Sequence, residues 1–176
     1  MDLFNIYLIT LRIVHIVGGA LWVGAGVYYF AFVEPTVKEL GPAGPQFMRI
    51  FMERRRVPLF MNIVSSLTVL SGALLFWSSS GGLQTAWLRS GPGIGFTIGA
   101  VAAVVVYGIG FFMIRPRAER LGAIGAELAI AGGPPSGAQA TELQQLDAEM
   151  TRIERLDVAL LMISLVTMAT ARYWTF

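Results

Sequence analysis

Cysteine is absent from this 176-residue chain, and histidine and lysine occur once each. Without cysteine there is no disulfide, no thiolate metal ligand and no cysteine nucleophile. The sequence also lacks the HExxH zinc motif, the Walker loop and the dinucleotide-binding glycine pattern. These absences exclude the enzyme classes that depend on such motifs.

Charge is scarce as well: 14% of the residues are charged and 55% are hydrophobic, whereas a soluble domain carries about 25% charged residues. The mean hydropathy is +0.65. This composition excludes a disordered chain and an ordinary soluble α/β enzyme. The net charge is +2, but the basic residues lie in loops beside apolar runs, which is typical of topology signals rather than of a nucleic-acid site. We therefore expect a lipid bilayer as the surroundings and no nucleic acid as a partner.

Four apolar stretches are long enough to cross about 30 Å of hydrocarbon, which takes ~20 residues. They cover residues 3–32, 57–77, 91–114 and 156–173. The predicted fold class is all-α: a four-transmembrane-helix bundle that makes residues 1–176 a single integral membrane domain.

The basic residues predict the orientation of these spans. Five of them lie in residues 33–56, five in residues 115–155, and one, Arg89, in residues 78–90. Because basic residues stay in the cytoplasm, both long loops are predicted there, with both termini outside. Residues 115–155 are predicted to form a helical hairpin, since a Gly/Pro-rich turn at 132–137 divides them and apolar residues follow at helical spacing.

Small residues recur every four positions on the third predicted span, at Gly91, Gly95, Gly99 and Ala103. Such rows let helix backbones approach closely inside a membrane. The pattern fits contacts within one chain as well as a homodimer.

One group of residues on the first span could carry chemistry. Spacings of three and four place five residues on one face of that helix: Arg12, His15, Gly19, Trp22 and Gly26. If the helix begins near Leu3, His15 lies ~18 Å along it at 1.5 Å per residue, close to the middle of the bilayer. Ionisable groups at that depth are costly and usually face the bundle interior, a cavity or a partner.

Haem binding is one interpretation of this face, because neutral imidazole is a common axial ligand of iron. In this interpretation His15 is the metal ligand, Gly19 leaves flat space for a porphyrin and Trp22 stacks beside it. Arg12 and Arg172 are candidates to pair with the propionates, and Met162 or Met168 is a candidate second ligand. A second histidine would have to come from a homodimer, because this chain has one.

The alternative interpretation is structural: His15 hydrogen-bonds across helices, with Ser65 and Ser66 of the second span nearby, and Arg12 extends to the membrane surface. Tyr107 is open to the same two interpretations, since its hydroxyl can reach a quinone or porphyrin or can bond across the bundle.

The segment His15-Ile-Val-Gly-Gly-Ala-Leu-Trp22-Val-Gly24-Ala-Gly26, continuing to Glu34-Pro35, resembles the first-helix pattern H-x6-W-x-G. That pattern occurs in small multi-pass bacterial membrane proteins of the CopD-like and HemJ-like type. The resemblance implies haem b at this histidine, as in HemJ-like proteins, which oxidise protoporphyrinogen, or a link to copper handling, as in CopD-like proteins. It also implies the inner (cytoplasmic) membrane of a bacterium.

Two departures from that pattern disfavour the activities of these two families, protoporphyrinogen oxidation and copper transport. The second, third and fourth spans contain neither Lys nor His, although HemJ-like proteins commonly carry a functional Lys on a later helix. The methionines are scattered in depth, which disfavours copper transport. The sequence thus predicts a haem b electron-transfer protein with a possible quinone partner. The alternative is a noncatalytic structural or accessory subunit of a larger respiratory or photosynthetic membrane complex.

Overall fold

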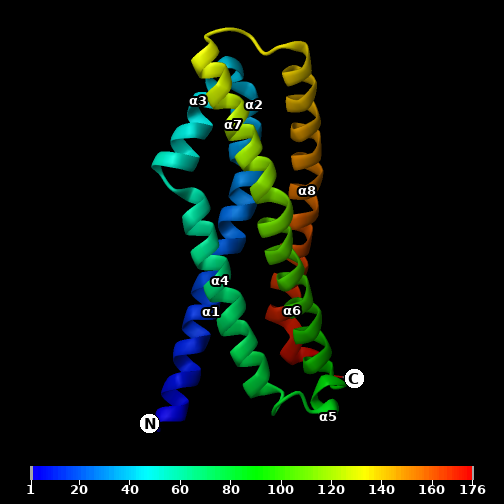
Figure 1. Ribbon diagram of the computed structural model, residues 1–176. Coiled ribbons are helices and arrows are strands. Elements are labelled where there is room, and N and C mark those ends of the chain that lie inside the picture. Colours follow the sequence, from blue (N-terminus) through cyan, green and yellow to red (C-terminus); the bar gives the residue numbers. More distant parts are fainter. Residues whose placement is uncertain (1, 176) are drawn as a thin grey trace.

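The computed structural model describes residues 2–175, and their regular structure is entirely helical (Figure 1). The prediction of an all-α fold is confirmed. Four long helices dominate the fold: α1 (Leu3–Tyr28), α4 (Val57–Ser79), α6 (Gly91–Ile109) and α8 (Gly137–Thr170). Shorter elements connect them: α2 (Glu34–Glu39), η2 (Gly41–Ala43), α3 (Gly44–Arg49), η3 (Ile50–Arg54) and α5 (Thr85–Leu88). A further short element, η5 (Ala171–Tyr173), follows α8.

Three continuous helices are long and apolar enough to cross a membrane: Leu3–Glu39, Val57–Ser79 and Gly91–Ala131. Helix α8 differs because its last 18 residues include three charged side chains, Glu154, Arg155 and Asp157. Length and composition therefore identify a membrane protein with three such helices.

The long helices pack as two pairs, α1 against α4 and α6 against α8. A small apolar cluster joins the pairs, and its members are almost fully buried: Trp22, Val64, Val106 and Leu161. Both termini lie at one end of the bundle, called the terminal end below (Figure 1). Helices α7 (Arg115–Ala131) and α8 form a hairpin at the opposite end, the hairpin end.

Two π-turns mark the places where apolar helices continue as polar ones. In η1 (Tyr29–Val33) the N–H of Glu34 donates to the carbonyl of Tyr29, and in η4 (Gly110–Ile114) the N–H of Arg115 donates to that of Gly110. A proline follows each turn, Pro35 and Pro116. Because a proline ring clashes with the carbonyl four residues earlier in an α-helix, the wider turn lets each helix continue through it.

Glycines set the spacing of α6 and α8. A Cβ atom on Gly95 would lie 2.8 Å from Cβ of Ala171, and one on Gly99 would lie 2.6 Å from Cγ of Met168. The Ser164 hydroxyl, which is buried, donates to the carbonyl of Gly99 at 2.9 Å. The row of small residues on α6 is thus used within the chain.

Ion pairs link the two arms of the hairpin. Nε of Arg117 on α7 lies 2.8 Å from Glu149 on α8, and Nε of Arg120 lies 2.6 Å from Glu142. Exposed pairs of this kind contribute between about 0 and 1 kcal/mol each. They fix how the arms align more than they stabilise the fold.

Substituting Gly95 with Ala should destabilise the protein by ~1–3 kcal/mol, because the added methyl meets the backbone and side chain of Ala171. The matched control is Gly108→Ala on the same helix, where nothing lies within 4 Å of an added Cβ. That control should leave stability unchanged or raise it by up to about 1 kcal/mol. Thermal unfolding in detergent measures both, and equal effects at the two positions would contradict this packing.

Candidate functional site

His15 lies at a close approach of α1 and α4. Gly18 of α1 makes this approach possible, because a Cβ there would be 2.7 Å from Oγ1 of Thr68. Gly72 of α4 leaves room for the imidazole, since a Cβ there would be 2.7 Å from Cε1 of His15. The ring therefore fills the space that Gly72 leaves, at a point where Gly18 lets the two helices lie close together.

A hydrogen bond fixes the orientation of this ring. Nδ1 of His15 lies 2.9 Å from the backbone carbonyl oxygen of Thr68. A carbonyl oxygen can only accept, so Nδ1 carries the proton and donates it. In the neutral ring the lone pair is then on Nε2. The partner across the helices is this carbonyl, whereas the sequence had indicated Ser65 and Ser66.

The hydroxyl groups of α4 are satisfied within their own helix near this point. The Thr68 hydroxyl donates to the carbonyl of Val64 at 2.7 Å, and that of Ser71 donates to the carbonyl of Thr68 at 3.2 Å. The Thr68 carbonyl thus accepts hydrogen bonds from the side chains of His15 and Ser71, and it lies within the regular helix α4. Between α1 and α4 at this point, the polar contact is therefore made by the histidine ring and not by these two hydroxyls.

The fixed tautomer is compatible with two roles. Histidines that bind metals usually donate the other ring N–H to a carbonyl or carboxylate, which orients the ring and leaves one nitrogen for the metal. The same hydrogen bond also joins α1 to α4 with no ligand present. The ring is partly exposed, so it retains surface through which a ligand can approach.

The other residues of the predicted haem site do not gather around His15. Gly19 contacts Thr68, with 3.6 Å between a Cβ placed there and Cγ2, and Trp22 is 5% exposed in the apolar cluster. Arg12 is exposed. Met162 on α8 is 41% exposed, so its side chain faces outward in part.

Two further residues are engaged in packing or bonding. Met168 packs against Gly99 at the interface of α6 and α8. The hydroxyls of Tyr107 and Ser66 lie 3.0 Å apart. Of the two interpretations offered for Tyr107, the bond across the bundle is the one observed.

Two grooves of the structure lie away from His15. Two shallow apolar grooves run along α6, and both are lined by Thr97, Val101 and Val105. His15 and Arg12 line neither groove. Among residues 2–175 no three His, Asp or Glu side chains are grouped so that they could hold a metal ion.

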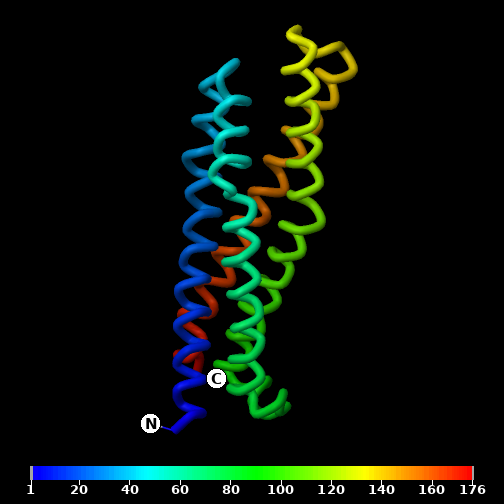
Figure 2. Tube along the Cα trace, turned by 60° about the vertical axis from the view of Figure 1, so that its left-hand side comes forward, coloured from blue at the N-terminus to red at the C-terminus, as the bar shows by residue number. Residues whose placement is uncertain are grey.

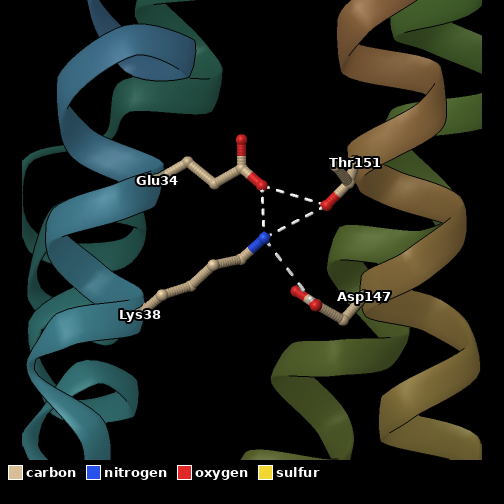
Figure 3. A network of polar contacts seen from close by, with 4 residues as sticks. All are labelled: Glu34, Lys38, Asp147 and Thr151. Atoms are coloured by element: carbon tan, nitrogen blue, oxygen red, sulfur yellow. Dashed lines mark hydrogen bonds and ion pairs between the residues drawn. The ribbon is translucent and has the colours of Figure 1, made fainter.

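A second polar site lies at the hairpin end, between α2 and α8 (Figure 3). Nζ of Lys38 donates to Oε1 of Glu34 at 2.7 Å and to Oγ1 of Thr151 at 3.2 Å, and it lies 3.8 Å from Oδ2 of Asp147. The Thr151 hydroxyl donates to Oε1 of Glu34 at 3.0 Å. The sequence placed Lys38 among the topology signals and did not indicate this cluster, although the single lysine four residues after Glu34 was a usable sign of an ion pair.

Glu154 extends this cluster toward the membrane boundary. It is 7% exposed, and its carboxyl lies within hydrogen-bonding reach of Glu34. It precedes the predicted span 156–173. Burial raises the pKa of Glu154 well above its usual range, and the nearby charge of Glu34 raises it further. One turn farther along α8, Oδ1 of Asp157 is buried without a hydrogen-bond partner.

No protein-family model, curated protein or solved structure matches this chain. The resemblance to CopD-like and HemJ-like proteins therefore stays a prediction from the first helix.

The His15 tautomer is directly testable, because a single histidine gives unambiguous side-chain nitrogen resonances. We expect the Nδ1–H form in the neutral ring, with Nε2 unprotonated, in nitrogen-15 spectra of the detergent-solubilised protein. Gly72→Ala should displace the ring and shift both resonances, since the new methyl would lie 2.7 Å from Cε1. Gly24→Ala is the control, because nothing lies within 4 Å there. Finding the proton on Nε2 would contradict the bond to Thr68.

Proposed function

We propose that this protein is an integral membrane haem b-binding protein that transfers electrons, with Nε2 of His15 as the axial ligand. The observation that supports this most is the bond from His15 Nδ1–H to the Thr68 carbonyl, 2.9 Å long. It gives the ring the tautomer and the fixed orientation of a metal ligand, and it does so at mid-membrane depth, where an imidazole is otherwise costly.

The residues fit a haem in part. His15 is partly exposed and Arg12, one turn toward the terminal end, is exposed, so both have surface left for a porphyrin and one propionate. Gly19 and Trp22 are engaged with Thr68 and the apolar cluster, and the proposal does not depend on them. The second ligand is Met162, a residue of a second copy, or none. Bound haem would supply one-electron chemistry, and a quinone is the electron partner we propose.

We also propose that α8 forms a fourth span, with both termini outside the inner membrane of a bacterium. The position of both termini at the terminal end supports an even number of crossings (Figure 1). The charged residues of α8 that break its apolar run lie near the predicted boundary, and Glu154 among them is buried. The basic loops at the hairpin end fit a cytoplasmic location.

A second candidate function is that of a noncatalytic accessory subunit in a larger membrane complex. It is favoured by the contacts of His15 within the chain. The ring is hydrogen-bonded to Thr68 and packed on Gly72, and these two contacts join α1 to α4.

The visible spectrum separates these functions. With haem supplied during expression, the purified protein should show a Soret band, and His15→Ala should abolish it while thermal unfolding shows that the fold is kept. Met162→Leu is the matched variant: it should alter the spin state if Met162 is the second ligand and change nothing otherwise. A colourless wild-type protein would rule out haem binding, and co-purification with other membrane proteins would then favour the accessory role.

The orientation is tested by cysteine labelling, which needs no background removal because the chain lacks cysteine. We expect a membrane-impermeant maleimide to label Ala86→Cys on intact spheroplasts and to label Ala148→Cys after the membrane is opened. Both positions are exposed. The reverse pattern would place the hairpin outside, and labelling of both on intact spheroplasts would contradict a membrane crossing by residues 91–114, which lie between the two positions.

A further inference from the structure

The hairpin end is where the two helix pairs are bridged by polar side chains. Figure 2 shows the tips of α2 and α3 standing apart from the tip of the α7–α8 hairpin at this end. Below these tips, Lys38 and Glu34 on α2 reach Asp147 and Thr151 on α8 (Figure 3). The strength of this bridge therefore depends on the charges of a few side chains.

The charges of the bridge are unbalanced. Lys38 is its one cation, and it faces the carboxylates of Glu34 and Asp147, so these three groups sum to a net charge of −1. Glu154 adds a further carboxyl close to Glu34. It lies on α8 three residues after Thr151, which is the other α8 residue that contacts Glu34. The hydroxyl of Tyr29 on η1 also interacts electrostatically with the carboxyl groups of Glu154, Glu34 and Asp147.

The state of Glu154 decides what this arrangement does. When it is protonated, it can donate a hydrogen bond to the Glu34 carboxylate, and the bridge keeps a net charge of −1. When it ionises, the carboxylates of Glu154 and Glu34 face each other in a place where Glu154 is shielded from water. Lys38 is then the one positive charge against three carboxylates, and the net charge becomes −2. A buried, unpaired charge is costly and like charges repel, so α2 and α8 are driven apart.

We propose that Glu154 and Glu34 form a proton-operated latch that holds α8 against α2 at the hairpin end, closed with Glu154 protonated and open with it ionised. The latch couples the α1–α4 pair to the α6–α8 pair. Glu34 follows His15 by more than four helical turns, so the proposed latch does not depend on whether His15 binds haem.

The direction of the pH effect follows from linkage. Burial first, and the Glu34 charge second, raise the pKa of Glu154 in the folded protein above that of an unfolded chain. The folded state thus binds the proton more tightly, and the stability that the closed latch contributes is present at low pH and lost as the pH rises through the raised pKa. Lys38 acts against this shift and Asp147 acts with it.

The latch can be followed by the distance between α2 and α8 without changing Glu154. Spin labels on Leu40→Cys and Ala148→Cys, both exposed and neutral positions, report this distance by pulsed electron resonance in an otherwise cysteine-free chain. We expect one short, narrow distribution at about pH 6 and a growing longer component at about pH 9.5, where Glu154 is ionised. An unchanged distribution across this range would overturn the proposal.

Three variants assign the titrating group. Glu154→Gln should keep the short distance at both pH values. Asp157→Asn, which changes a buried carboxyl one turn away, and Glu53→Gln, which changes an exposed one on η3, should behave like the wild type. Opening at high pH in Glu154→Gln, or loss of opening in Asp157→Asn, would overturn the role of Glu154.

Discussion

The close approach of helix backbones at glycine is the constraint on which the rest of this fold depends. Inside a bilayer, water does not drive apolar helices together, so contact area and interhelical hydrogen bonds must do so. Gly99 brings α6 against α8, Gly95 brings it against η5 directly after α8, and Gly18 and Gly72 bring α1 against α4. Each approach places a carbonyl within reach of a polar side chain on the other helix: that of Gly99 for Ser164 and that of Thr68 for His15. The polar contacts are thus consequences of the glycine spacing.

The same constraint explains how a histidine is accommodated within an apolar helix that is long enough to span a membrane. A ring nitrogen left without a partner in hydrocarbon would cost several kcal/mol, and the Thr68 carbonyl removes that cost for one nitrogen of His15. Within residues 2–175, the other ring nitrogen, Nε2, has no such carbonyl partner. In a haem protein iron would bind it, and in an accessory subunit the partly exposed ring would contact a partner protein. The contact to α4 is common to both functions, which is why it supports ligand binding without requiring it.

Periodicity and composition predicted the features that depend on local sequence. The apolar runs gave the three helices that are long enough to span a membrane, and the spacing of Gly91, Gly95 and Gly99 gave a helix-packing face. What periodicity could not supply was the partner across that face, because a row of small residues fits another helix of the same chain as well as a second copy. Spacing also placed Gly19 and Trp22 on the face of His15, and Gly19 does contact Thr68, the residue that His15 bonds. Trp22, two turns from His15, packs in the apolar cluster with Val106 and Leu161 of the other helix pair, and no local pattern predicts partners so far away in the sequence.

The polar bridge at the hairpin end is a second contact that local sequence patterns could not predict. Glu34 and Thr151 are separated by more than a hundred residues, so no local pattern joins them. The position of Glu34 depends on the π-turn η1, since Pro35 would otherwise interrupt the helix there. Because this turn keeps α1 and α2 continuous, the helix carries Glu34 and Lys38 past its apolar stretch and places them beside α8. At that depth a carboxyl is buried enough to hold a proton and close enough to water to lose it. A contact that titrates can therefore join the two helix pairs at this place. The contact of His15 has a different role, because it joins α1 to α4 within one pair.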